Sequence, residues 1–202
     1  MSAVVAHSFS HTLQLWDNNT LTTTTIMREI YFAGGCFWGT QHLFKQVRGV
    51  VATEVGYANG ITESPTYEEV YSDRTGHAEC VKVVYNPEVV ALEVLLKLFF
   101  RSIDPLSLNR QGADCGTRYR TGIYYTREED IPVIESIYCQ VEQEVGEGLM
   151  VEFEPLRSFY SAEEYHQDYL DKNPSGYCHI SLELFHYARH INSGEESSLR
   201  VV

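Results

Sequence analysis

The order of strand-like and helix-like segments between residues 28 and 125 limits the possible folds of this chain more than any other feature of its sequence. Alternating or short apolar runs predict strands, and apolar residues three or four positions apart predict helices. The predicted elements are, in order, strand 28–33, helix 37–47, strand 49–60, strand 77–85, helix 91–102 and strand 120–125. This succession is typical of the split βαβ, or ferredoxin-like, arrangement.

A further helix is predicted after the last of these strands. Thr126 and Glu129 have the spacing of a capping box, in which each residue caps the backbone of the other. The helix is expected to reach about Val145, with Pro132 bending it or delaying its start.

The second half of the chain adds a strand and another helix. The segment "MVEFEP" (150–155) predicts the strand, and Ser161 with Glu164 predicts a cap for a helix over 162–172. We therefore expect an α+β protein: a ferredoxin-like two-layer sandwich with an extra helix and strand and a long C-terminal tail.

Composition restricts the partners of the chain. Its 202 residues, 44% of them hydrophobic, suffice for one domain with a sizeable core. A formal net charge of −13 repels phosphate backbones and anionic lipid, so neither nucleic acid nor a membrane surface is an expected partner. The chain has no apolar run of about 20 residues and no basic, apolar start typical of an export signal. A cytoplasmic protein is expected.

Five cysteines are scattered along the chain: Cys36, Cys80, Cys115, Cys139 and Cys178. An odd number without an export signal does not indicate a disulfide framework. Cys80 and Cys139 lie in apolar periodic segments and are expected to be small buried residues. Cys36 differs because "GGCFWG" (34–39) leads from a strand through glycines into a helix, and the positive end of the helix dipole favours a thiolate there.

Three chemistries of a cysteine at a helix start can be tested by spacing. A thioredoxin-type Cys-x-x-Cys requires a second cysteine at the position of Gly39. A phosphatase loop requires arginine at the position of His42, and a nucleophile elbow requires glycine at the position of Trp38. All three are excluded.

A metal site is not expected, whereas two further functions fit the sequence. "HAEC" (77–80) resembles the His-x-Glu of zinc deaminases, but the chain lacks their Pro-Cys-x-x-Cys. A cysteine hydrolase that pairs Cys36 with a distant histidine, such as His77 or His166, is compatible with the sequence. So is a noncatalytic binding module with a buried Cys36.

Several motifs together resemble one family. They are "GGCFWG", "GYANG" with "PTYEEVYS", "RTGHAE", "DPLSLNRQGADCGTRYR" and "FYSAEEYHQDYLDKNPSGYC". In content, order and spacing they are similar to the peptide methionine sulfoxide reductases of the A type, over about residues 28–180. The resemblance implies an α+β two-layer sandwich and an oxidoreductase, a peptide-methionine (S)-S-oxide reductase. It implies repair of oxidative damage by thiol-dependent reduction of methionine S-sulfoxide, free or in proteins.

The resemblance also implies catalytic roles. Cys36 is the nucleophile, and Glu79 is the acid, which an enclosed site must keep neutral. Tyr67 and Tyr119 are the phenol donors to the sulfoxide oxygen. By pattern alone, a glutamate in an alternating strand is expected to face water, and any one of 14 tyrosines is expected to be a packing residue.

Three more residues are implied to bind the substrate. Asp114 organises the site and holds the polar end of the substrate. Phe37 and Trp38 form a slot for the methyl group on the sulfur; by position alone, both also fit an ordinary helix core.

Recycling of the nucleophile requires a second thiol. Reduction of the substrate leaves Cys36 as a sulfenic acid, which a thiol converts into a disulfide. Cys178, after the flexible "NPSG", is the implied resolving cysteine, and thioredoxin, or dithiothreitol in vitro, restores both thiols without any bound cofactor. Cys115, beside Asp114, is a rival. Residues 179–202 contain no cysteine, so a two-cysteine cycle without a relay is expected.

The expected organisation has three parts. Residues 1–27 are interpreted as a flexible N-terminal extension, residues 28–180 as the catalytic domain and residues 181–202 as a C-terminal tail. The protein is expected to act as a monomer on oxidised proteins and on free methionine sulfoxide.

Overall fold

A mixed six-stranded sheet forms the centre of the molecule, which is described by a computed structural model over residues 26–146 and 148–191. The strands lie in the order β7-β6-β1-β3-β2-β8. Their bounds are β1 Arg28–Gly34, β2 Val50–Ala58, β3 Ala78–Tyr85, β6 Thr121–Tyr125, β7 Val151–Pro155 and β8 Phe159–Ser161. The predicted extension at 1–27 lies almost entirely outside the described residues.

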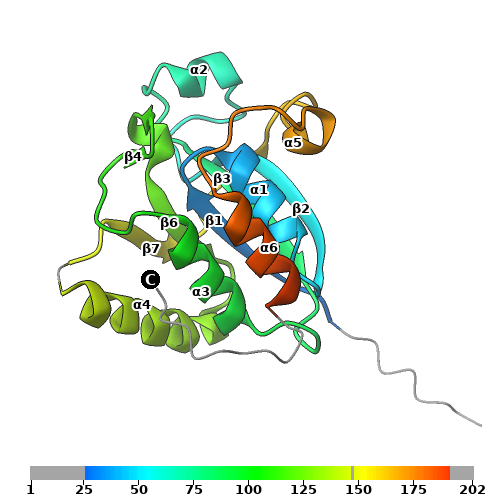
Figure 1. Cartoon of the computed structure of the whole chain (residues 1–202). Coiled ribbons are helices and arrows are strands. Elements are labelled where there is room, and N and C mark those ends of the chain that lie inside the picture. Colours follow the sequence, from blue (N-terminus) through cyan, green and yellow to red (C-terminus); the bar gives the residue numbers. More distant parts are fainter. Residues whose placement is uncertain (1–25, 147, 192–202) are drawn as a thin grey trace, which may run out of the picture.

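Four of these strands and two helices form the predicted split βαβ core. Helix α1 (Phe37–Lys45) connects β1 to β2, and helix α3 (Leu92–Ser102) connects β3 to β6. The four strands stand in the order β6-β1-β3-β2, and each neighbouring pair is antiparallel. Figure 1 shows α1 and α3 on the same face of the sheet. The predicted ferredoxin-like fold is therefore confirmed.

Aromatic side chains join the sheet to these two helices. Phe32 of β1 stacks on Phe44 of α1 with ring centroids 4.7 Å apart, and on Phe99 of α3 at 4.9 Å. All three side chains are fully buried. Burial of side chains of this size contributes roughly 1.5–3 kcal/mol each, so this stack fixes α1 firmly against the end of β1.

Helix α4 (Ile131–Val145) begins later than the sequence predicts. A short 3-10 turn over Glu128–Asp130 precedes it, and Pro132 lies in its first turn, where a missing N–H costs nothing. The predicted capping box at Thr126 is wrong. Cys139 is exposed, contrary to expectation, because the buried face of α4 consists of Ile134, Ile137 and Val141. Cys80 is fully buried, as predicted.

The predicted helix over 162–172 is mostly wrong. Only helix α5 (Tyr169–Lys172) forms, and Asp168 before it has a left-handed backbone with φ of 53°. The side-chain amide of Gln167 explains the difference, because it accepts from Val55 N at 2.9 Å and donates to Val55 O at 2.8 Å, as a strand residue would. Pairing with the edge of β2 thus replaces helical hydrogen bonding here.

Two helices of the structure are absent from the sequence-based prediction. Helix α2 (Tyr67–Tyr71) starts with a true capping box between Thr66 and Glu69. Helix α6 (Leu182–His190) lies in the part of the chain that the sequence suggests to be a C-terminal tail, and it packs against α1. Within the described residues, no helix is long and apolar enough to cross a membrane.

Candidate active site

Cys36 stands where β1 ends and α1 begins. Gly35 precedes it with φ of 81°, and a Cβ atom at Gly35 would lie 2.6 Å from Cβ of Gln111, so only glycine fits this turn. Cys36 is the N-cap residue of α1 and is 6% exposed. The sequence predicted this location at a helix start.

Burial reverses the expected effect on the thiol. The pKa of Cys36 is raised well above its ordinary value, first by burial and then by the nearby charge of Glu79. Hydrogen bonds from the backbone N–H groups of Trp38 and Gly39 lower it, but by less. The N–H groups at the helix end thus favour the thiolate, as expected, but burial outweighs them and keeps the pKa of the thiol high.

Glu79 is buried next to this thiol. It belongs to β3, is 2% exposed, and its Oε2 accepts a hydrogen bond from Phe37 N at 3.1 Å. Burial raises its pKa to about 8, although the Phe37 N–H and the charge of Arg118 lower it. Residues 78–81 of β3 are all buried, so alternation did not turn this glutamate to water. At neutral pH, the carboxyl is largely protonated and can donate a proton.

Two tyrosines lie close enough to Glu79 for its charge to act on them. Burial and then the charge of Glu79 raise the pKa of Tyr67 to about 12, and the same two causes raise the pKa of Tyr119 further. Tyr67 begins α2, and Tyr119 ends a 3-10 turn over Thr117–Tyr119. Both phenols are therefore neutral at physiological pH and able to donate a hydrogen bond.

Arg118 connects the elements that carry these tyrosines. Its guanidinium lies over the rings of Tyr71 and Tyr119, at 4.2 and 4.4 Å from their centroids. Its Nη1 donates to the backbone oxygen of Tyr71 and to Asp73 Oδ2. Arg118 thus joins α2 to the 3-10 turn and supplies a positive charge near Glu79.

The two aromatic residues after Cys36 differ in environment. Phe37 is 1% exposed, whereas Trp38 is half-buried. The Trp38 ring stacks on Tyr169 with centroids 3.7 Å apart, and its Nε1 donates to Nδ1 of His166 at 3.1 Å. The indole is therefore held from two sides beside the thiol.

Asp114 belongs to a small hairpin of β4 (Arg110–Gln111) and β5 (Asp114–Cys115). Its carboxylate accepts from the hydroxyl of Tyr177 at 3.0 Å, and its charge raises the pKa of Cys36 and of Glu79. Neighbouring strand residues point to opposite faces, and Cys115 is exposed. Asp114 thus faces the site, while Cys115 faces away from it.

Cys178 lies against the first turn of α1. A Cβ atom at Gly39 would be 3.0 Å from Sγ of Cys178, so this glycine makes room for the thiol. Cys36 and Gly39 are three positions apart and share one face of the helix. Cys178 therefore lies about one helical turn from Cys36. Its side chain is partly buried, which raises its pKa.

No local pattern assigned a supporting role to four polar and aromatic residues of this site. They are Tyr57, Glu163, His166 and Tyr169. All four lie within the motifs "GYANG" and "FYSAEEYHQDYLDKNPSGYC", and for the last three the local pattern suggested a helix instead. Their function depends on contacts between distant parts of the chain, and no local pattern records such contacts.

The two histidines considered for a cysteine hydrolase have other partners. His77 accepts from Gly60 N with Nδ1 and bonds the oxygen of Thr62 with Nε2, so it closes a loop. His166 uses Nδ1 for Trp38, and burial lowers its pKa. Among the hydrogen bonds of the described residues, none joins a ring nitrogen of either histidine to Cys36.

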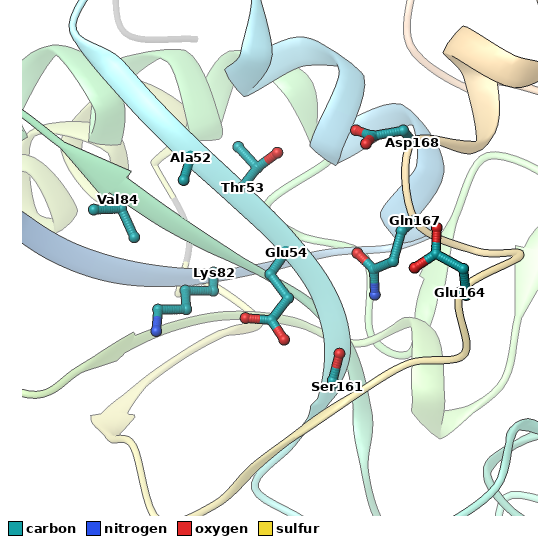
Figure 2. Close-up of a pocket in the computed structure, with 9 residues that line it drawn as sticks. All are labelled: Ala52, Thr53, Glu54, Lys82, Val84, Ser161, Glu164, Gln167 and Asp168. Carbon is teal, nitrogen blue, oxygen red and sulfur yellow. The ribbon is translucent and has the colours of Figure 1, made fainter.

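The elements that carry these residues gather at one end of the molecule. Figure 1 shows α2, β4 and α5 together at the top of the view, where α1 begins. A separate hollow lies along β2 towards its other end. Figure 2 shows Glu54, Ser161 and Gln167 around this hollow, which contains neither Cys36 nor Glu79. Its lining includes Lys82 and three carboxylates, and it differs from the site of Cys36.

Comparison with known proteins gives consistent matches. The family model of peptide methionine sulfoxide reductase matches residues 28–196. Peptide methionine sulfoxide reductase MsrA of Clostridium botulinum (strain Okra / Type B1) is 52% identical over 157 residues, which cover 78% of this chain and 100% of the relative.

Solved structures agree with the sequence matches. Mxr1 from Saccharomyces cerevisiae in reduced form superposes with a TM-score of 0.73 at 39% identity, over 77% of this chain and 91% of that chain. Mxr1 in complex with Trx2 superposes with a TM-score of 0.51 at 28% identity, over 71% and 84% of the two chains.

Proposed function

The chain belongs to the peptide methionine sulfoxide reductase family, as an A-type enzyme that reduces methionine sulfoxide, and from this membership we propose which of its residues carry out each step. Cys36 is the nucleophile, Glu79 the proton donor, and Tyr67 and Tyr119 the phenols that bind the sulfoxide oxygen. Phe37 and Trp38 accept the methyl group on the sulfur, and Asp114 organises the polar side of the site.

The first step transfers one oxygen atom. The Cys36 sulfur attacks the sulfoxide sulfur while Glu79 donates its proton to the sulfoxide oxygen, and the proton of the thiol returns to the carboxylate. The sulfur–oxygen bond of the substrate breaks as the oxygen passes to Cys36. Methionine leaves, and Cys36 remains as a sulfenic acid. The Cys36 sulfur thereby loses the two electrons that the sulfoxide gains.

One observation carries this assignment: Glu79 is buried and protonated beside the thiol. Its Oε2 accepts from the N–H of Phe37, the residue that follows the nucleophile, at 3.1 Å. A sulfoxide becomes electrophilic only when its oxygen is protonated or hydrogen-bonded, and a carboxyl with a pKa of about 8 supplies that proton at neutral pH.

The second step forms a disulfide. The Cys178 thiol attacks the sulfur of the Cys36 sulfenic acid, water leaves, and a Cys36–Cys178 disulfide results. The position of Cys178 beside Gly39 supports this assignment, as does the outward direction of Cys115. Exchange with reduced thioredoxin returns both thiols, an inference supported by the likeness to Mxr1 in its complex with Trx2. Such a cycle requires a reducing compartment, which supports the cytoplasm as its place.

Resolved epimers test the substrate assignment. The protein is incubated with methionine S-sulfoxide or R-sulfoxide and dithiothreitol, and methionine is measured. Loss of the S-epimer alone is expected, and Cys36→Ser should abolish it. Equal loss of both epimers, or an acyl-enzyme without consumption of reductant, would contradict the proposal.

Peptide mapping tests the resolving cysteine. One equivalent of substrate without reductant should leave Cys36 joined to Cys178. Cys178→Ser should stop turnover with thioredoxin after one equivalent, whereas the matched variant Cys115→Ser should turn over normally. A disulfide between Cys36 and Cys115 would assign the resolving role to Cys115.

A further inference from the structure

The carboxylate of Glu163 joins two elements that meet at the active site. It lies in the segment between β8 and α5, and both of its oxygens are engaged. Oε2 accepts from the hydroxyl of Tyr57 at 2.7 Å, and Oε1 accepts from the backbone N–H of Tyr67 at 2.8 Å. The two donors belong to β2 and α2, which this single side chain therefore connects.

The Tyr57 end of this connection is rigid. Tyr57 is fully buried in β2, and in the sheet it pairs directly with Glu79 of β3. Its ring also lies beside Phe37, with centroids 6.0 Å apart. Tyr57 thus binds Glu163 from the strand position that pairs with Glu79, the proposed proton donor.

The Tyr67 end is the first residue of a short helix. The capping box of α2 satisfies the backbone N–H groups of Thr66 and Glu69, and the N–H of Tyr67 between them bonds to Glu163 instead. Five residues are too few for a helix to be stable alone. The location of Tyr67 therefore depends on contacts such as this one.

Glu163 and Glu79 differ in their protonation. Burial tends to raise the pKa of Glu163, but hydrogen bonds from Tyr57 and from the backbone N–H of Tyr67 outweigh it, and the pKa is lowered. Glu163 is thus an anion that only accepts hydrogen bonds, whereas Glu79 is a protonated donor. A negative charge beside the start of α2 also suits the helix dipole.

We propose that Glu163 is a positioning residue for the reaction: by bridging the Tyr57 hydroxyl and the Tyr67 backbone, it holds the Tyr67 phenol at the sulfoxide oxygen. The proposal rests on the proposed role of Tyr67 as a donor. Glu163 itself touches no reacting atom. Its loss should slow the oxygen-transfer step and change substrate affinity little, because Phe37 and Trp38 form the methyl slot.

A double-mutant cycle tests the proposal through single-turnover reduction of methionine S-sulfoxide. Glu163→Ala should lower the single-turnover rate at saturating substrate roughly tenfold or more, while the substrate concentration that gives half of this rate stays within about twofold. Glu163→Gln, which keeps an acceptor for the Tyr67 N–H, should stay within about threefold of wild type. In a Tyr67→Phe background, Glu163→Ala should cost almost nothing more, because the group that it positions is already gone.

Two further variants separate positioning from folding. Tyr57→Phe removes only the hydroxyl that donates to Glu163. If Glu163→Ala does not fold, a double-mutant cycle of Tyr57→Phe with Tyr67→Phe gives the same test. Glu164→Ala is the matched control, since this neighbouring side chain is 90% exposed and its carboxylate forms an ion pair with Lys172.

The outcomes distinguish the two levels of inference. The positioning role is overturned if Glu163→Ala lowers the single-turnover rate by the same factor in the Tyr67→Phe background as in the wild-type background. The same holds for Tyr57→Phe when it replaces Glu163→Ala. The function of Tyr67 then still stands. If Tyr67→Phe is as fast as wild type, the donor role of Tyr67 fails, and the positioning proposal fails with it.

Discussion

At the scale of single residues, burial decides the chemistry of this protein more than sequence position does. Cys36 stands at a helix start that favours a thiolate, yet burial keeps its pKa high. Glu79 stands in a strand whose pattern suggests solvent, yet it is buried and its pKa is about 8. The sequence identifies both residues by motif, but burial results from packing across the sheet, which no local spacing encodes.

Glu79 should make stability depend on pH. Between its ordinary pKa near 4.5 and its folded pKa of about 8, the folded protein holds a proton that the unfolded chain has released. The free energy of unfolding should therefore fall as pH rises through this window, by about 1.4 kcal/mol per pH unit from this group.

Glu79→Gln removes that titration. Denaturant unfolding at pH 5 and pH 8 should show the variant gaining stability relative to wild type as pH rises. Parallel pH dependence of the two proteins would show that Glu79 is not held protonated by the fold.

Gly39 offers a test of recycling that leaves the nucleophile intact. Gly39→Ala places a Cβ only 3.0 Å from Sγ of Cys178, so the thiol has to shift. The first equivalent of sulfoxide should be reduced within about twofold of the wild-type rate, while steady-state turnover with thioredoxin should fall at least about tenfold. Gly148→Ala is the control, because a Cβ there meets nothing within 4 Å. Normal turnover of Gly39→Ala would show that Cys178 resolves from another position.

At the scale of elements, the split βαβ core was predictable because its signals are local. Strand alternation and helical spacing arise within each segment, and the four strands and two helices of this core follow them. The segment 162–168 was not predictable, because its side chains bond to distant elements. Gln167 pairs with Val55, and Glu163 bonds Tyr57 and Tyr67. The same long-range contacts explain why the supporting residues of the site were missed.

Gln167 should contribute to stability as an added strand residue would. Gln167→Ala leaves the N–H and C=O of Val55 without their side-chain partners at the edge of β2. We expect a loss of about 1–3 kcal/mol in the free energy of unfolding, measured in urea. Glu164→Ala, in the same segment, should change it by less than about 0.5 kcal/mol. Equal effects of the two variants would contradict the role of Gln167.

At the scale of the whole molecule, the proposed active site and helix α6, which covers part of the core, belong to different parts of the chain. The residues proposed to react lie where β1 passes into α1, with α2, β4 and α5 around them (Figure 1). We propose that residues 28–180 carry the catalytic activity. Helix α6 lies beyond them, yet its Phe185 and Ala188 are buried against the core.

Removal of residues 181–202 should therefore separate stability from chemistry. The truncated chain should reduce one equivalent of sulfoxide per folded molecule at the wild-type rate, but its Tm should fall by about 5 °C or more because the core loses cover. In the full chain, Phe185→Ala should reproduce much of this loss, and Leu182→Ala, at an 83% exposed side chain, should not. An unchanged Tm after truncation would show that α6 adds nothing to the core.

The stack of Trp38 on Tyr169 also gives the site an optical signal. The chain has two tryptophans, and Trp38 is the one within the described residues. Its indole lies 3.7 Å from the Tyr169 ring and bonds to His166, so its fluorescence depends on those two neighbours and, if the proposal is right, on what enters the proposed methyl slot. With Trp16→Phe to remove the other emitter, intrinsic emission should report substrate entry in real time and without a label.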